Sequence, residues 1–404
     1  MASLIALGVA LTGLGATVLW CDRLEAQYIH ALAPEFTAEK LQGVALQNQA
    51  FAQRDLLVLY GSSELVKEMP NNATQFFQDY PSGFRVFPVG KPGTTSLGIL
   101  QKVAAVGPGI DGHKVAFSIS PGWFFTEIFD PTFYEGNFSE LQANELAFSR
   151  ELSPALKRDV ARRMLDFPKT IEPGALLDFS LRRLAGDTWP DHALYALAFP
   201  LGRLQCAVGR IQDHVESALH ILDVNEQLNP SPQRGLRALN WNEVLKRAAQ
   251  IAKSTAVHAK TNEVKRRHLP SASKDGTFMQ TMDRAREWTD IELLMRTLKE
   301  LHAAPLFLSM PVEDVRLEVY GISNASRLAY MARMNALAAK YEIPLADFRD
   351  HEADNSFMVD FLDHLSGEGW LFYNKALDDF FHDRFSSGND SRIEHKNHKG
   401  PLDF

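Results

Sequence analysis

Cysteine and net positive charge are both scarce in this sequence of 404 residues. Its two cysteines, Cys21 and Cys206, are too few for a disulfide framework, and neither stands in a metal-ligand spacing. The formal net charge is −8, whereas general nucleic-acid-binding proteins carry a basic surface, so we expect no nucleic-acid partner. With 45% hydrophobic and 23% charged residues, the composition is that of a globular protein.

Charged side chains are missing from the first 21 residues, and residues 4–20 form a continuous apolar run. A cleaved signal peptide would have basic residues before this run and a small-residue cleavage site directly after it, and neither is present. The run is about long enough to cross a bilayer as a helix. We therefore predict a single uncleaved transmembrane anchor at residues 1–21, followed by an amphipathic helical stalk at residues 22–54.

Five short apolar runs have the length and composition of strands that are buried on both faces of a sheet. Helical patterns separate them, which predicts an α/β fold with a doubly wound, mainly parallel sheet. A long helical insertion at about 125–303 divides the predicted domain at 55–384, and the polar tail at 385–404 is predicted to be disordered. The five runs are 56–60, 84–89, 114–120, 305–310 and 343–348.

The first of these runs ends at Gly61, and two hydroxyl side chains follow at once, Ser62 and Ser63. Open α/β sheets place their chemistry at the carboxyl ends of the strands, so Ser63 is a candidate nucleophile if a histidine reaches it. The alternative is a loop that leads into a helix, with Ser62 as the N-cap and Glu64 as an acidic residue in the first turn.

The second run ends in a glycine-rich loop, Gly90–Ser96. A nucleotide-binding P-loop needs Ser or Thr directly after its Gly-Lys pair, whereas Pro92 follows Lys91 here, which excludes that type of site. Backbone N–H groups in a loop of this kind can still face a developing oxyanion.

A histidine flanked by carboxylates, His364, lies beyond the last strand-like run. A serine nucleophile needs such a base, and the base needs an acid to orient it, for which Asp360 and Asp363 are both candidates. We favour Asp360, because an offset of four residues keeps two side chains on one helical face, whereas adjacent side chains diverge. The alternative is an ordinary helix cap beside a solvated histidine.

Taken together, these motifs resemble those of the DltD family, which are membrane-anchored proteins of D-alanyl lipoteichoic acid biosynthesis. The resemblance spans nearly the whole chain, because the motifs follow the N-terminal apolar run in the family's order and spacing. They are Gly61-Ser62-Ser63-Glu64, Gly90–Ser96, Ser120-Pro121-Gly122-Trp123-Phe124, Ser309-Met310-Pro311, Tyr320-Gly321-Ile322-Ser323, Ala346-Asp347-Phe348 and His364-Leu365-Ser366-Gly367-Glu368-Gly369-Trp370.

The resemblance implies an SGNH-hydrolase-like domain on the extracytoplasmic side of the membrane. SGNH enzymes use the serine in the third position of their motif, which corresponds to Ser63 and not to Ser62, and the family's base corresponds to His364. Their acid normally lies three residues before the histidine, a position that is Phe361 in this sequence. The sequence also departs from many family members at Gly122, where they carry a larger polar residue.

The implied activity is acyl transfer, in which a D-alanyl group passes through an ester on Ser63 to a hydroxyl of a cell-surface polymer. Gly93, and after it Gly90, is the candidate for a backbone donor to the oxyanion, and Glu64 is a candidate contact for the alanyl ammonium group. An esterase or thioesterase that hydrolyses D-alanyl esters, and a non-catalytic adaptor, remain alternatives. Implied partners are a membrane-bound O-acyltransferase, indirectly an acyl carrier protein, and the anionic polymer or glycan that receives D-alanine. No metal or organic cofactor is implied.

Overall fold

The structure is a computed structural model of the chain. It describes residues 2–228, 238–247, 273–312, 317–318, 321–352, 356–360 and 364–386.

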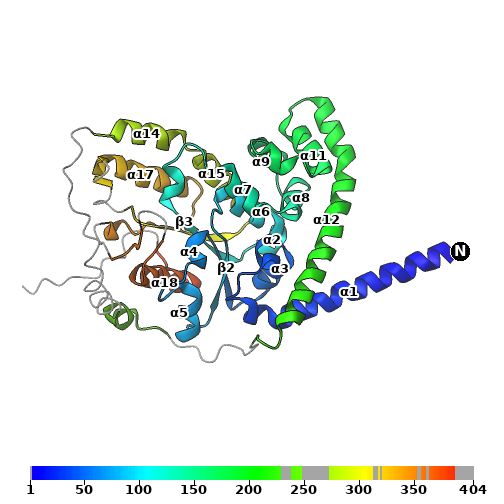
Figure 1. The fold of residues 1–404 in the computed structure, drawn as a ribbon, viewed down its shortest axis with the longest axis horizontal. Helices are drawn as coiled ribbons and strands as arrows, with labels where there is room; N and C mark the ends of the chain where they lie inside the picture. The colour runs from blue at the N-terminus through cyan, green and yellow to red at the C-terminus, as the bar shows by residue number, and fades with distance from the viewer. Residues whose placement is uncertain are drawn as a thin grey trace, which may run out of the picture.

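The centre of the molecule is a five-stranded sheet in which every strand pairing is parallel, in the order β2-β1-β3-β4-β5 (Figure 1). This confirms the predicted α/β fold and its parallel sheet. The chain enters at β1 and then builds outward on both sides of it, so the direction of winding reverses between β1 and β3. The strands are β1 (Leu56–Tyr60), β2 (Arg85–Val89), β3 (Lys114–Ile119), β4 (Ala304–Ser309) and β5 (Leu345–Ala346).

Both faces of the sheet are buried, as the continuous apolar runs predicted. Alternate side chains of β1 enter different clusters: Val58 belongs to one apolar cluster and Leu57 to the other. The first cluster is covered by α3, α6 and α15, and the second by α5 and α18, among other segments. These helices are α3 (Ala45–Ala52), α5 (Ala73–Asp79), α6 (Ser96–Val106), α15 (Glu287–Glu300) and α18 (Gly367–Phe381).

The described part of the chain between β3 and β4 contains helices and no strand. The helix α12, with 36 residues, is about 54 Å long and flanks the body of the molecule (Figure 1). The α-helices of this part are α7 (Pro131–Asn137), α8 (Glu140–Ala147), α9 (Pro154–Met164), α10 (Pro168–Ile171), α11 (Ala175–Ala185), α12 (Trp189–Val224), α14 (Asp275–Arg284) and α15, with a further helical stretch at 241–247. The remaining helices are α2 (Ala38–Gln42), α4 (Ser63–Val66), α17 (Asn324–Lys340) and three short 3-10 helices, Gly107–Ile110, Pro121–Phe124 and Arg349–His351.

The first helix, α1 (Ala2–Leu32), runs without a break through the predicted anchor and into the segment for which we expected a stalk. Within the described ranges, no helix is long and apolar enough to count as a membrane span, so the structure does not confirm the predicted anchor. The rest of the expected stalk packs on the sheet domain: Leu46 and Phe51 of α3 are buried in the same apolar cluster as Val58. Of the predicted disordered tail at 385–404, residues 387–404 lie outside the described residues.

Candidate functional site

The turn at the end of β1 carries Ser63 to the carboxyl edge of the sheet. The Gly61 N–H donates to the Val89 carbonyl at 3.2 Å, which extends the β1–β2 ladder by one residue, and α4 begins at Ser63. A Cβ atom on Gly61 would lie 2.3 Å from the Glu64 carboxylate, so a residue with a side chain cannot occupy this position without displacing that carboxylate. The sharp change from strand to helix therefore depends on a glycine directly before the two serines.

An antiparallel bridge holds His364 in front of the same edge. In this bridge, the Val359 N–H donates to the His364 carbonyl at 3.0 Å and the Ser366 N–H donates to the Phe357 carbonyl at 2.9 Å. Ser366 also accepts hydrogen bonds from two backbone N–H groups at the start of α18, both at 3.1 Å. The histidine is thus fixed between an antiparallel bridge and a capped helix.

Ser63, His364 and Asp360 form one chain of hydrogen bonds. The distance from Ser63 Oγ to His364 Nε2 is 3.0 Å, and His364 Nδ1 contacts Asp360 Oδ2. The other oxygen of Asp360 accepts the His364 backbone N–H at 3.0 Å, so both carboxylate oxygens fix the position of the histidine. A serine, an imidazole and a carboxylate in this order form the arrangement that activates a hydroxyl nucleophile.

Lys67 also binds this carboxylate, and the sequence analysis did not identify it. Its Nζ lies 3.0 Å from Asp360 Oδ2, the oxygen that faces His364, and the two side chains are 38% and 40% exposed. Partial burial acts to raise the pKa of Asp360, but the hydrogen bonds and charges of Lys67 and His364 outweigh it, so the pKa lies below its ordinary value. Lys67 follows Ser63 by four residues, and this spacing is the only feature of the sequence that indicates a place for Lys67 near the site.

The glycine loop after β2 lies against the end of β1. A Cβ atom on Gly90 would be 2.1 Å from the Gly61 carbonyl oxygen, and Gly93 has a φ of +79°, which favours glycine. The Thr94 hydroxyl contacts the Lys91 carbonyl at 2.7 Å and the Asn137 side chain at 2.6 Å, which ties the loop to α7. The loop is therefore held beside the serine turn, as a backbone oxyanion donor requires.

Ser62 and Glu64 face inward. Ser62 is 2% exposed, and its hydroxyl donates to the Lys91 carbonyl at 3.4 Å and makes no cap hydrogen bond to α4, in contrast to the N-cap alternative. The Glu64 carboxylate, also 2% exposed, accepts the Ser62 N–H at 2.9 Å. This geometry favours a structural role for Glu64 over contact with an ammonium group. The second candidate acid, Asp363, lies outside the described residues.

The family model of the DltD protein matches residues 33–382, which is most of the chain. The chain belongs to the DltD family.

Three curated relatives have the name Protein DltD. The one from Bacillus subtilis (strain 168) is 28% identical over 351 residues, covering 84% of this chain and 86% of its own length. The one from Staphylococcus aureus (strain NCTC 8325 / PS 47) is 22% identical over 344 residues, covering 84% and 85%. The one from Lacticaseibacillus rhamnosus is 21% identical over 367 residues, covering 87% and 83%. Membership of the DltD family implies a role in the D-alanylation of teichoic acids.

In this DltD family member, a groove of about 470 Å³ opens beside the serine turn. Lys67, which binds Asp360, forms part of its wall, whereas Ser63, His364 and Asp360 do not line it. Its other walls combine apolar side chains, including Phe36 and Leu65, with amide side chains, including Asn72 and Gln75. The groove therefore runs along α4, the helix that begins at Ser63.

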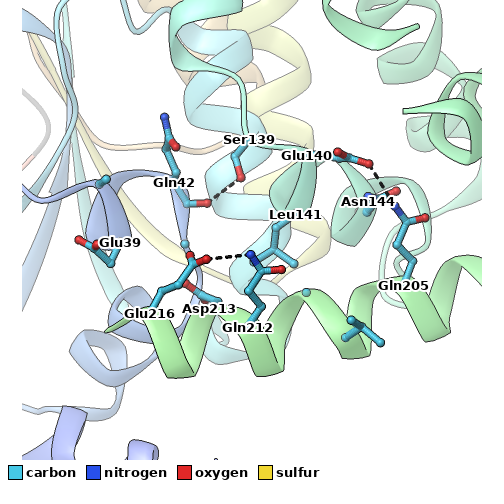
Figure 2. A pocket seen from close by; sticks show the side chains of 14 residues that line it. Glu39, Gln42, Ser139, Glu140, Leu141, Asn144, Gln205, Gln212, Asp213 and Glu216 are labelled. Carbon is cyan, nitrogen blue, oxygen red and sulfur yellow. Dashed lines mark hydrogen bonds between the residues drawn. The ribbon is translucent and has the colours of Figure 1, made fainter. Parts of the chain in front are cut away.

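A second cavity, of about 390 Å³, lies between α2, α8 and α12 (Figure 2). Carboxylates and amides line it, but none of Ser63, His364 or Asp360 does. Its carboxylates are already engaged in part: Asp213 accepts two backbone N–H groups at 2.7 Å, and Glu216 binds Gln212 at 2.7 Å. In the part of the chain that the structure describes, no group of His, Cys, Asp and Glu side chains is arranged to hold a metal ion.

Buried carboxyl groups support the far end of the glycine loop. The Glu287 carboxylate accepts the Ser96 N–H at 2.9 Å, at the N-terminus of α6, and Arg163 binds the neighbouring Asp290 through two nitrogens at 2.8 and 2.9 Å. Burial, and after it the charge of Asp290, raises the pKa of Glu287. The helix that follows the glycine loop is thus tied to α15.

Proposed function

We propose that this chain is an acyltransferase that carries a D-alanyl group on Ser63 and delivers it to a hydroxyl of a teichoic acid. The observation that supports this most directly is the hydrogen-bonded series Ser63–His364–Asp360 at the carboxyl edge of a parallel sheet. Family membership supports the choice of acyl group and acceptor, since the role of the family is D-alanylation. No cofactor is needed for this chemistry.

In the first step, the Ser63 oxygen attacks the carbonyl carbon of a D-alanyl ester or thioester while its proton passes to His364 Nε2. For this, Nδ1 carries the proton that faces Asp360, whose negative charge stabilises the imidazolium that forms. The tetrahedral intermediate then expels its alcohol or thiol, which takes the proton from Nε2. The products are a D-alanyl ester on Ser63 and the free leaving group.

In the second step, the same atoms work in reverse order. An acceptor hydroxyl gives its proton to His364 Nε2 and attacks the ester carbonyl, and Ser63 leaves with the proton returned to its oxygen. Backbone N–H groups of the glycine loop, with Gly93 as the first candidate, would stabilise the oxyanion in both steps. Water in place of the acceptor gives hydrolysis, so the isolated protein should show weak esterase activity.

The site must also lie where its donor and acceptor meet. We propose that the chain is held on the outer side of the cell membrane by the uncharged first part of α1, where a membrane-bound O-acyltransferase supplies the acyl group that originates on a carrier protein. Exposed apolar side chains along α1 support this location: Ile5 is 63% exposed, Val9 is 68% exposed and Leu19 is 62% exposed.

The test is turnover of a D-alanyl ester or a p-nitrophenyl ester by purified full-length chain and its variants. Ser63→Ala and His364→Ala should each lower turnover by roughly a thousandfold or more, and the double variant should lose little beyond either single one, because the two groups act as a unit. Ser62→Ala is the matched control, since it removes a neighbouring hydroxyl that does not contact His364.

Circular dichroism and thermal unfolding establish that each variant is folded. If folded Ser63→Ala retains wild-type turnover, or restores teichoic acid D-alanylation fully in a deletion strain, the catalytic proposal fails. An adaptor that only recruits the O-acyltransferase would then be the better explanation.

A further inference from the structure

The outer face of α12 is an uninterrupted apolar surface. Between residues 194 and 208, every side chain of α12 that is exposed is apolar, and the exposed fraction reaches 78% at Leu197, 57% at Leu201 and 59% at Leu204. Isolated exposed leucines are common on proteins, but a continuous exposed apolar face on one long helix indicates an interaction. The exposed residues are Leu194, Ala196, Leu197, Pro200, Leu201, Leu204, Ala207 and Val208.

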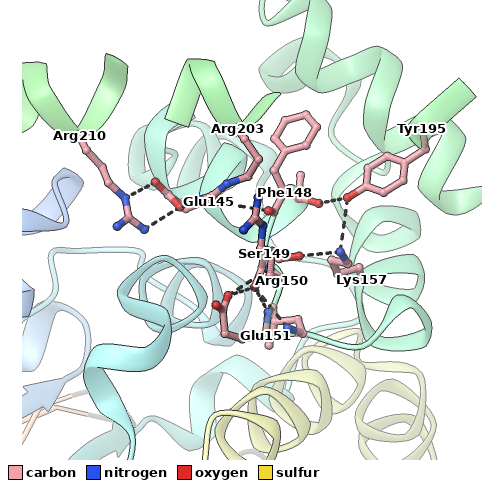
Figure 3. Close-up of polar contacts among 11 residues, drawn as sticks. Glu145, Phe148, Ser149, Arg150, Glu151, Lys157, Tyr195, Arg203 and Arg210 are labelled. Carbon is pink, nitrogen blue, oxygen red and sulfur yellow. Dashed lines mark hydrogen bonds and ion pairs between the residues drawn. The ribbon is translucent and has the colours of Figure 1, made fainter. Parts of the chain in front are cut away.

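Three polar side chains of α12, those of Tyr195, Arg203 and Arg210, extend toward α8 (Figure 3). Arg210 and Arg203 both contact Glu145 of α8, whose side chain is only 3% exposed, with Arg210 at 2.8 Å and Arg203 at 3.4 Å. The Tyr195 hydroxyl donates to the Ala147 carbonyl at 2.7 Å. Both arginines therefore pair with Glu145 on the side of α12 that faces α8, and none of the exposed residues from 194 to 208 carries a charge.

The width of this face distinguishes a membrane from a partner helix. At 100° per residue, the exposed apolar residues of α12 cover an arc of about 160°. Trp189, which is 80% exposed, lies within this arc at the first turn of the helix. A coiled-coil partner requires only a narrow seam of two residues in seven, usually bordered by charged residues that pair across the interface. A wide, charge-free arc that includes an exposed tryptophan is typical of a helix that lies in the plane of a bilayer surface.

The helix α1 indicates on which side of the molecule a membrane would lie. It packs across the C-terminal part of α12, where Glu25 binds His214 at 2.9 Å and Ala218, within the same arc, is 1% exposed. From there α1 projects away from the body, on the side of the molecule along which α12 lies (Figure 1). A helix that enters a bilayer along this direction brings the bilayer surface toward the open part of the α12 face.

We propose that the outer face of α12 lies in the interfacial layer of the membrane and sets the orientation of the sheet domain on it. This inference rests on the membrane location proposed above and not on the chemistry of Ser63. The face carries no basic side chain from 194 to 208, so its binding depends on buried apolar area and not on anionic lipid. Neutral phosphatidylcholine vesicles are therefore the appropriate probe.

The experiment places a fluorophore on a cysteine at position 201, as Leu201→Cys, in the full chain reconstituted into phosphatidylcholine vesicles. Part of the lipid carries a nitroxide quencher near its headgroup. Leu328→Cys is the matched control, because Leu328 is 45% exposed on α17, on the opposite side of the molecule from α12 (Figure 1). The native Cys21 and Cys206 are each 1% exposed, and the unsubstituted protein measures any background labelling.

We expect roughly a twofold loss of fluorescence at position 201, as for a side chain held at headgroup depth, and no loss at position 328. If the protein floats with the vesicles but both labels keep their intensity, the α12 inference is wrong and the membrane location stands. If the protein does not float, both are wrong.

A second copy of the chain is the other possible occupant of this face. If the label at 201 is shielded from iodide but not quenched by lipid, and Leu201→Cys cross-links two chains, the face binds a second copy and the inference is overturned. Ester turnover of the same samples reports on the catalytic proposal separately.

Discussion

Asp360 is the residue on which the geometry of the site converges. One of its oxygens, Oδ2, faces both the His364 ring and the Lys67 ammonium group, and the other holds the His364 backbone. The lysine thus competes with the imidazole for the same negative charge, while also preventing the carboxylate from rotating. Because it contacts Asp360, Lys67 is a positioning residue in the proposed mechanism.

We expect Lys67→Met to lower ester turnover by roughly tenfold at neutral pH, because the carboxylate loses the charge-assisted hydrogen bond that prevents its rotation. It should also move the acidic limb of the pH–rate profile to higher pH, because the carboxylate, freed from Lys67, stabilises the imidazolium more strongly. The pKa of Asp360 itself should rise toward its ordinary value. Steady-state kinetics across pH 5 to pH 9, about the range of a histidine base, measure both effects.

Lys375→Met is the matched control for this variant, because Lys375 is also 38% exposed and binds Asp379 at 2.6 Å in an ion pair of the same kind. It should leave the profile unchanged, and Lys67→Arg should restore it. A loss of turnover in Lys67→Met with no movement of the acidic limb would mean that Lys67 serves only the local fold.

At this scale the sequence favoured the carboxylate that contacts His364 in the structure, but it did so by a helical spacing. Asp360 was favoured because an offset of four residues aligns side chains on a helix, whereas the structure pairs the segments on either side of the two residues in an antiparallel bridge. Ser62 lies at the N-cap position of α4, as its place in the sequence predicted, but its hydroxyl makes no cap hydrogen bond. It instead contacts the Lys91 carbonyl in the loop after β2. A contact between loops that are distant in sequence leaves no local pattern to read.

At the scale of elements, the N-terminus of α6 depends on the protonation of buried carboxyl groups. The pKa of Glu287 is raised in the folded protein, so the fold favours the protonated form. The stability that this provides is complete below the pKa of an unfolded glutamate and is lost as the pH rises through the folded pKa. The free energy of unfolding should therefore decrease from about pH 5 to about pH 8, which spans the raised range.

Glu287→Gln keeps an oxygen that accepts the Ser96 N–H but removes the titration. We expect its melting temperature to exceed that of the wild type by roughly 2–4 °C at pH 8, with no gain near pH 5. Thermal unfolding at both pH values measures this. Glu292→Gln on the same helix should act in the opposite direction: hydrogen bonds from Lys340 and Tyr341 outweigh partial burial and lower the pKa of Glu292, so its loss costs stability at pH 8. Equal pH dependence in Glu287→Gln and wild type would refute the prediction.

The sequence predicted the strands more accurately than the helices. Buried parallel strands are continuous apolar runs between turn residues, so all five were located to within a few residues. The extent of α12 was not predictable in the same way, because its outer face is apolar and exposed, whereas polar side chains such as Tyr195 and Arg203 lie on the side that packs on α8. This arrangement is the reverse of the pattern by which amphipathic helices are recognised.

For the whole molecule, the proposed location makes a prediction that is independent of chemistry. Membrane fractionation should recover the full chain in the membrane pellet, and mass determination should find its N-terminus intact, because the first 21 residues contain no charged side chain and no suitable cleavage site. Carbonate washing should not release it, whereas detergent should. Recovery of a soluble protein that begins near Pro34 would contradict the prediction.

The serine and the histidine that it contacts are 301 positions apart in the chain, because β1 begins the sheet and the turn around His364 follows its last strand. At synthesis rates of roughly 5–20 residues per second, the hydroxyl is made roughly 15–60 s before the base that is to activate it. In the proposed mechanism, a chain that stops before His364 has Ser63 but not its base. Incomplete products would therefore not capture acyl groups, and this ability would arise only when the polypeptide is almost finished.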